Sequence, residues 1–132
     1  MKKVVLVGHC GADSSYLRIA VVSAGVAGAA VVAADDQEAL EVALQNGAEL
    51  VLINRVLDWG FDEQEGVALL ARLRHTHPLV KIMLVSNYPD AQQAAVAAGA
   101  LPGFGKREIG SNRVKELLKN ALSQANASAK VV

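Results

Sequence analysis

Nearly continuous apolar runs constrain this chain more than any other feature. Val, Ile, Leu and Met fill residues 3–8, 49–54 and 80–86 with few polar residues between them, and an Ala-rich run covers residues 29–34. A strand with one face in water would alternate apolar and polar side chains. Strands without that alternation are typical of parallel sheets whose two faces are both covered. The sequence therefore predicts strands that are buried on both sides.

Segments with helical spacing separate these runs, and their ends carry capping residues. We expect Asp13 to cap a helix that runs to about Ser23, and Asp35 with Glu38 to open a helix that Gly47 ends. Further helices are predicted around residues 67–73, from Pro89 to just before Gly99, and around residues 114–122. Strands and helices therefore alternate along the whole chain.

This alternation, with short connections, predicts an α/β fold: a three-layer, doubly wound arrangement around a five-stranded parallel sheet. The fifth strand, residues 100–104, is weak because it contains Pro102 and Gly103, so we expect it at an edge of the sheet. In such folds ligands gather beyond the carboxyl ends of the strands. The residues at those ends are therefore the candidates for function.

Composition narrows the class of protein. The 132 residues include 13 Lys plus Arg and 13 Asp plus Glu, so no net charge attracts nucleic acid or an anionic membrane. The single cysteine, Cys10, cannot form an internal disulfide, the N-terminus lacks the features of a signal peptide, and no apolar stretch is long enough to span a bilayer. We expect one cytoplasmic domain over residues 1–123 and a flexible tail over residues 124–132.

Three polar residues at strand ends suggest a family. Asn54 ends the third strand, Ser86 ends the fourth, and the stretch GALPGFGK delivers Lys106 after the fifth. With the order of elements from residue 3 to about 123, this resembles the receiver domain of two-component response regulators. The resemblance implies a flavodoxin-like sheet of order 2-1-3-4-5. It places Asn54 at the phosphoacceptor aspartate, Ser86 at the hydroxyl that contacts the phosphoryl group, and Lys106 at the invariant lysine.

The chain departs from that family in ways that bear on its chemistry. His9 and Cys10 stand where the family has the acidic residues that hold Mg²⁺, and the amide of Asn54 is too poor a nucleophile to form an acyl phosphate. Arg107 replaces the usual proline, and Gly103 the usual aromatic residue. We therefore expect an atypical receiver domain whose degenerate pocket, formed by His9, Cys10, Asn54, Ser86 and Lys106, is not phosphorylated.

The neutral pocket leads to two expectations about its contacts. Asn54 is expected to hydrogen-bond Ser86, Lys106 or a backbone group. The ammonium group of Lys106 is expected to be partly exposed and to find solvent, Asp58, Asp62 or a carbonyl group, because an unpaired buried charge is costly.

The loop after Asn54 is acidic and carries two aromatic rings. Asp58 and Asp62 are alternative candidates for an acceptor or a metal ligand, although a solvated acidic loop is the expected interpretation. Of Trp59 and Phe61, we expect one ring to pack as a lid over the end of the sheet and the other to contact a partner.

The first loop offers a different function. In VGHCGADSS, a cysteine follows the first strand at a helix N-terminus, which resembles the phosphocysteine loop of B components of sugar phosphotransferase systems. Cys10 would then serve a phosphocarrier or a thiol-dependent enzyme. A small buried thiol is the alternative interpretation. No spacing of ligand residues or glycines predicts a metal or another cofactor.

The favoured hypothesis is a module of signal transduction that is not an enzyme and acts through protein–protein interaction. The resemblance places its contact surface on the fourth helix, fifth strand and fifth helix. Another protein is the expected partner, and a signalling protein and a second copy of this chain are the two candidates. Neither nucleic acid nor membrane is expected as a partner.

Overall fold

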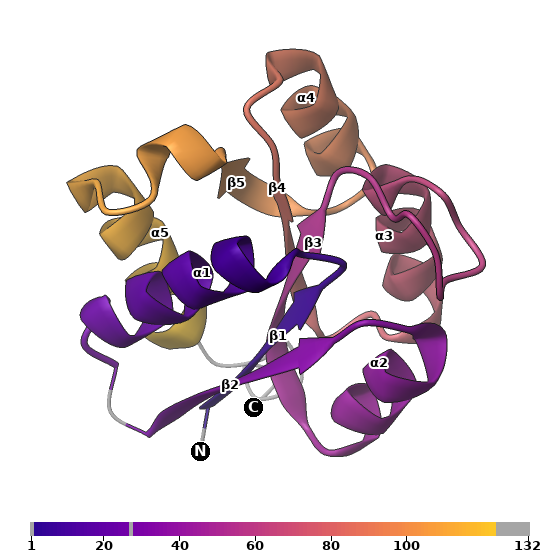
Figure 1. The fold of residues 1–132 in the computed structure, drawn as a ribbon, viewed down its shortest axis with the longest axis horizontal. Helices are drawn as coiled ribbons and strands as arrows, with labels where there is room; N and C mark the ends of the chain where they lie inside the picture. The colour runs from indigo at the N-terminus through magenta and orange to yellow at the C-terminus, as the bar shows by residue number, and fades with distance from the viewer. Residues whose placement is uncertain (1, 27, 124–132) are drawn as a thin grey trace, which may run out of the picture.

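The apolar runs form one parallel sheet of five strands in the order β2-β1-β3-β4-β5 (Figure 1). This computed structural model describes residues 2–26 and 28–123. The strands are β1 (Lys2–Val7), β2 (Ala29–Ala34), β3 (Ala48–Asn54), β4 (Lys81–Val85) and β5 (Leu101–Phe104). The predicted doubly wound fold and strand order are therefore confirmed.

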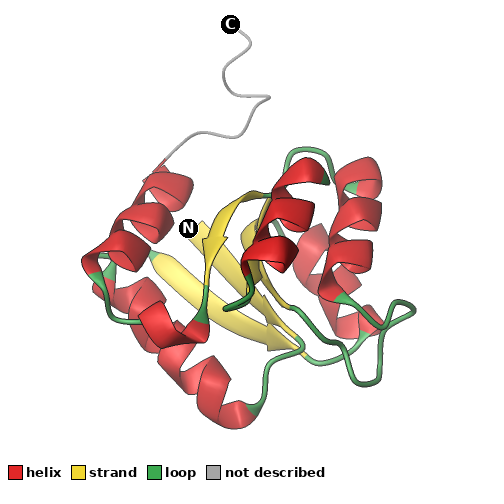
Figure 2. Ribbon diagram, turned by 90° about the horizontal axis from the view of Figure 1, so that it is seen from above, coloured by secondary structure: helices red, strands yellow, loops and turns green. Residues whose placement is uncertain are grey.

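Helices cover both faces of the sheet (Figure 2). Two of them, α1 and α5, pack on one face, and α2, α3 and α4 pack on the other. A short 3-10 turn, η1 (Lys106–Glu108), follows β5. The helices are α1 (Gly11–Ser23), α2 (Gln37–Gln45), α3 (Gly66–Thr76), α4 (Pro89–Ala97) and α5 (Asn112–Ser123). None of these described helices has the length and apolar character that a membrane span requires.

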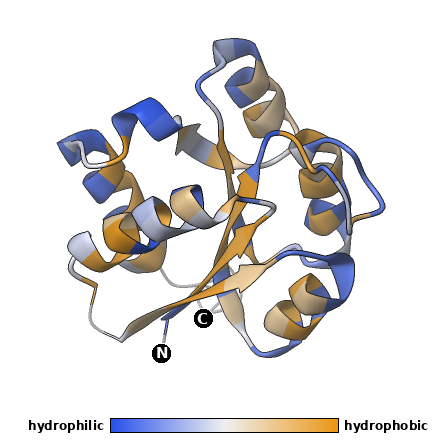
Figure 3. Cartoon of the chain, viewed as in Figure 1, coloured by the Kyte–Doolittle hydropathy of each residue, from blue (hydrophilic) through white to orange (hydrophobic). Residues whose placement is uncertain are grey.

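Alternate side chains of β3 enter two different cores, which explains why the strand lacks polar alternation. Val51 and Ile53 pack beneath α2, α3 and α4, whereas Leu50 and Leu52 pack beneath α1 and α5, and all four are fully buried. Figure 3 accordingly shows the strands at the centre of the sheet as hydrophobic, whereas the helices carry both hydrophobic and hydrophilic residues. Asn54 ends the strand half-buried, at the point where it leaves both cores.

Two predicted helix starts are wrong by a few residues. Cys10, and not Asp13, is the N-cap of α1, and its sulfur accepts the backbone N–H of Asp13 at 3.5 Å. Asp36, and not Asp35, caps α2 by accepting the N–H of Ala39 at 2.8 Å. In both cases the cap has extended backbone angles. Because Cys10 caps α1, the side chain of Asp13 is not used as the cap.

The fifth strand lies at an edge of the sheet, as the sequence predicts. β5 is an edge strand that pairs only with β4, and Pro102 is exposed on it, as predicted. The predicted C-terminal tail, residues 124–132, lies outside the described residues.

Candidate functional site

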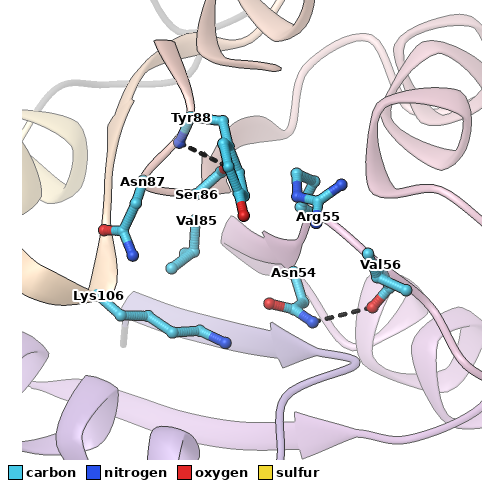
Figure 4. Close-up of a pocket in the computed structure, with 8 residues that line it drawn as sticks. All are labelled: Asn54, Arg55, Val56, Val85, Ser86, Asn87, Tyr88 and Lys106. Carbon is cyan, nitrogen blue, oxygen red and sulfur yellow. Dashed lines mark hydrogen bonds between the residues drawn. The ribbon is translucent and has the colours of Figure 1, made fainter. Parts of the chain in front are cut away.

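The carboxyl ends of three elements bring Asn54, Ser86 and Lys106 to one cavity of about 180 Å³ (Figure 4). Asn54 is the last residue of β3 and pairs in register with Val85, so that Ser86 follows just beyond the same edge of the sheet. Lys106 opens the turn after β5. The remaining lining residues are Arg55, Val56, Val85, Asn87 and Tyr88.

Asn54 holds the start of its own loop. Its side-chain Nδ2 donates to the carbonyl oxygen of Val56 at 2.9 Å, which is the backbone group among the three partners expected from the sequence. Figure 4 shows the amide nitrogen turned toward Val56 and the amide oxygen on the opposite side, within the cavity. The amide thus fixes the loop and adds no charge to the cavity.

Lys106 is paired with a carboxylate that the sequence did not suggest. Its Nζ lies 2.7 Å from Oδ2 of Asp13, and the two side chains are 33% and 27% exposed. Lys106 is therefore partly exposed as expected, but its expected partners Asp58 and Asp62 are wrong. The physical reason is that α1 begins at Gly11, which places Asp13 in its first turn and close to η1. The hydrogen bond from Lys106 lowers the pKa of the Asp13 carboxyl group.

Ser86 is buried and closes the turn before α4. Its Oγ accepts the backbone N–H of Tyr88 at 3.1 Å, so the hydroxyl hydrogen stays available for another acceptor. The next residue, Asn87, accepts the backbone N–H of Arg107 at 3.2 Å and thereby ties this turn to the turn after β5.

His9 and Cys10 line a separate hollow of about 290 Å³, together with Gly8, Asp35, Asp58 and Trp59. The single degenerate pocket predicted from the sequence is therefore divided in two. Asn54, Ser86 and Lys106 line one part, and His9 and Cys10 line the other. Among the described residues, no group of three or more His, Cys, Asp or Glu side chains is placed to hold a metal ion.

The two aromatic rings of the acidic loop differ in their exposure. Phe61 is half-buried against the core under α2 and α3, whereas Trp59 is 76% exposed. Asp58 lines the hollow beside Cys10. The pKa of Arg72 is raised chiefly by its hydrogen bond with Glu63, and the charge of Asp62 adds to this effect. Neither Asp58 nor Asp62 lines the cavity that holds Asn54 and Lys106.

Cys10 and its neighbour His9 differ in their exposure. The Cys10 thiol is exposed at the N-terminus of α1, so the interpretation of a buried thiol is wrong. The His9 ring is only 7% exposed, and its Nε2 donates to the carbonyl oxygen of Leu52 at 2.9 Å. Burial lowers the pKa of His9 to about 4, which leaves the ring neutral near pH 7.

Gln92 is a residue of this region that sequence reasoning missed. Its side chain crosses from α4 to the sheet, and its Nε2 is shared among the carbonyl oxygens of Leu84 at 2.9 Å, Ser86 at 3.1 Å and Phe104 at 3.3 Å. A glutamine in an Ala-rich helix gives no signal of such a role. The contact ties α4 to the ends of β4 and β5.

Gly103 leaves the space that Gln92 uses. A Cβ atom at position 103 would lie 2.2 Å from the carbonyl oxygen of Leu84 and 2.9 Å from Oε1 of Gln92. Any larger side chain here would therefore have to displace the strand or the glutamine. The aromatic residue that the family resemblance places at this position has no room in this arrangement.

Comparison with known proteins gives the fold. No family model and no curated protein matches the sequence. Among solved structures, the signal receiver domain of a DNA-binding response regulator from Colwellia psychrerythraea superposes with a TM-score of 0.72 at 16% identity, covering 94% of this chain and 100% of that one. NtrX from Brucella abortus gives a TM-score of 0.74 at 19% identity and covers 91% of this chain.

A third neighbour widens the range of proteins that share the fold. CpaE from Burkholderia thailandensis, a protein assigned to pilus assembly, gives a TM-score of 0.69 at 21% identity, covering 94% of this chain and 100% of that one. In contrast, this chain spans only 27% of NtrX. At these identities the likeness shows that the chain has the receiver fold.

The buried His9 generates a prediction about pH. The pKa of His9 is lowered from 6.5 to about 4 in the folded protein, so between these values protonation favours the unfolded state. The free energy of unfolding therefore keeps its full value above pH 6.5 and decreases as the pH falls toward 4. This loss is about 3 kcal/mol at 1.36 kcal/mol per pKa unit. Urea unfolding at pH 7, 5.5 and 4.5 measures it, and His9→Gln should flatten the dependence between pH 6.5 and 4.5.

The exposed His75 of α3 provides the matched control, because His75→Gln removes an imidazole that is not buried. This variant should retain the pH dependence of the wild type. An equal loss of stability in His9→Gln over the same range would contradict the assignment to His9.

Proposed function

We propose that this chain is an atypical receiver domain of two-component-type signal transduction, which is not phosphorylated at the usual site and acts by binding another protein. One observation carries the proposal: the residue at the end of β3 is a neutral amide, Asn54. The ion pair of the nearby Lys106 with Asp13 at 2.7 Å adds support. The receiver fold supports the class of protein, and these residues support its atypical behaviour.

The chemistry of the cavity argues against a covalent phosphoryl intermediate on β3. An acyl phosphate needs a carboxylate nucleophile, and Asn54 offers an amide. Mg²⁺ prefers carboxylate ligands, and the cavity beside Asn54 has none among its lining residues. His9 and Cys10, at the end of β1, line a different hollow. We therefore assign no catalytic role to these residues.

The region around α4 supports a fixed rather than a switching surface. Gln92 joins α4 to three carbonyl oxygens at the ends of β4 and β5, and Gly103 carries no side chain that could alternate between two positions. A two-state switch needs an element with two packed arrangements. A movement of α4 that carried Gln92 away from the ends of β4 and β5 would break its hydrogen bonds to these carbonyl groups.

The contact surface in this proposal is the face of α4, β5 and α5. A groove of about 460 Å³ lies there, with Gln92, Gln93, Val96, Ala97, Pro102, Gly103 and Arg113 along it. Val96 is 46% exposed, and Pro102 is exposed beside it on the edge strand. Exposed apolar side chains in a groove are typical of protein interaction sites. The partner is a signalling protein or a second copy of this chain.

Phosphorylation is tested by incubating the protein with acetyl phosphate and Mg²⁺ and measuring its intact mass. We expect no increase by a phosphoryl group in the wild type, because the amide of Asn54 replaces the nucleophile. Asn54→Asp should gain little adduct, since the carboxylates that would hold Mg²⁺ are also missing near it.

Two variants identify an adduct if one forms. An adduct that survives in Cys10→Ala and disappears in Asp58→Asn would show a conventional receiver that uses a displaced aspartate. An adduct that disappears in Cys10→Ala would instead establish a phosphocysteine. Either result overturns the proposal that this domain does not accept phosphate.

The contact surface is tested by Val96→Asp on α4, with Val42→Asp on α2 as the matched control. The two valines are 46% and 50% exposed, so the same substitution places the same charge on two different helices at similar cost. Affinity capture from the native cells, with sedimentation to detect dimers, should show a partner that Val96→Asp loses and Val42→Asp keeps. Loss in Val42→Asp alone would contradict the assignment.

A further inference from the structure

The hollow at the ends of β1 and β2 combines an exposed aromatic ring with two carboxylates. We propose that it receives an arginine side chain of a partner protein. Arginine fits because its planar guanidinium group stacks on aromatic faces and forms paired hydrogen bonds with carboxylates. The inference rests on the proposed function, since the domain must bind another protein, and it adds a second contact surface and the chemistry of its ligand. The lining residues are Gly8, His9, Cys10, Asp35, Asp58 and Trp59.

The loop between β3 and α3 is anchored at its base and carries Trp59. Val56 and Glu65 form an antiparallel bridge there, and the backbone N–H of Leu57 donates to the carbonyl oxygen of Gln64 at 2.9 Å. Leu57 is only 2% exposed and packs in the core under α2 and α3. The segment that leads to Trp59 is therefore held from both sides.

The tip of the loop is fastened to its neighbours as well. The backbone N–H of Gln37 donates to the carbonyl oxygen of Gly60 at 2.7 Å, and Arg72 of α3 pairs with Glu63 at 2.5 Å. Trp59 is nevertheless 76% exposed. An aromatic side chain that is exposed on a firmly held loop is suited to anchor a protein contact, because little additional ordering is needed on binding.

The charge around the hollow favours a cation. Residues 35–65 hold nine of the 13 acidic residues of the chain and one of its 13 Lys and Arg residues, Arg55, which lies over the Tyr88 ring and lines the other cavity. Asp35 and Asp58 are exposed, and within residues 2–26 and 28–123 no ion pair involves either of them. Both carboxylates are therefore available to a guanidinium group. The nine acidic residues are Asp35, Asp36, Glu38, Glu41, Glu49, Asp58, Asp62, Glu63 and Glu65.

His9 adds a hydrogen-bond acceptor that lacks a donor. The side chain is only 7% exposed, and its Nδ1 has no hydrogen-bond partner among the described residues. Because Nε2 donates to Leu52, Nδ1 of the neutral ring carries a lone pair. A buried acceptor without a partner costs free energy, which a ligand rich in N–H donors can offset. The lining is thus rich in acceptors, and a guanidinium group has five N–H donors.

The hollow has room for this group. It offers about 290 Å³, whereas one water molecule needs roughly 10–15 Å³ on the same measure. Among the described residues, no three His, Cys, Asp or Glu side chains are placed to hold a metal ion. An organic cation whose donors are spread over a plane therefore fits the lining better than a metal ion does.

The experiment is a titration of the full chain with the N-acetylated, C-amidated tripeptide Gly-Arg-Gly, followed by amide NMR at constant ionic strength. We expect saturable shifts at Gly8, Cys10 and Asp58, and none with the tripeptide Gly-Gln-Gly. The fluorescence of Trp59, the single tryptophan of the chain, should change over the same range of peptide concentration. Asp58→Asn and Trp59→Leu should each weaken binding about threefold, as expected for one exposed ion pair or one cation–π contact.

Asp62→Asn is the matched control, because it removes the same charge from an exposed position of the same loop that does not line the hollow. It should bind the arginine peptide as the wild type does. The inference is overturned if this peptide does not saturate, if the glutamine peptide binds equally well, or if Asp62→Asn and Asp58→Asn weaken binding equally.

Val96→Asp separates this inference from the proposed contact surface. It should bind the arginine peptide as the wild type does, because Val96 lines the groove of α4 and β5 and not the hollow. Loss of peptide binding in Val96→Asp would overturn the inference. A peptide that does not saturate, together with a captured partner that Val96→Asp still loses, would overturn this inference alone and leave the proposed function standing.

Discussion

The ion pair between Lys106 and Asp13 is the interaction on which the rest of this site depends. A lysine at the carboxyl edge of a parallel sheet needs a counter-charge, and here α1 supplies it from its first turn, where the helix dipole also favours a carboxylate. Because Asp13 pairs with Lys106, no acidic residue is needed at the end of β3. The neutral amide of Asn54 can therefore stand there without leaving Lys106 unpaired. A half-exposed pair of this kind contributes at most about 1 kcal/mol to stability. Its main effect is to fix the position of the Lys106 ammonium group.

Side-chain hydrogen bonds also connect α4, β4 and β5 at this end of the sheet. Gln92 bonds to carbonyl groups of β4, β5 and the turn between β4 and α4, and the missing side chain of Gly103 makes room for it. Asn87 joins the turns after β4 and β5. These contacts would hold the face of α4 and β5 rigid. A fold shared with response regulators and with a pilus assembly protein does not by itself choose among functions, so these side chains carry the argument.

Several features of the structure could be predicted because local chemistry determines them. The unbroken apolar run of β3 fixed a strand covered on both faces, and Pro102 placed β5 at an edge. The partners of Lys106 and Gln92 could not be predicted, because each depends on where a helix packs against the sheet and the sequence pattern does not encode that placement. The helix starts shifted for a related reason: Cys10 and Asp36 became caps through backbone angles, and Asp13 then faced Lys106. The division of the predicted pocket into two hollows could not be predicted either, because it depends on how the strand ends and loops pack against one another.

The central claim is that this receiver fold occupies one state at the carboxyl end of its sheet. Relaxation-dispersion NMR on the uniformly labelled protein measures it most directly, because exchange between two packed states falls in the microsecond-to-millisecond range. The account predicts flat dispersion profiles for the amides of Ser86, Gly103 and α4. Dispersion at all of these positions with a shared exchange rate would show a working switch and would contradict it.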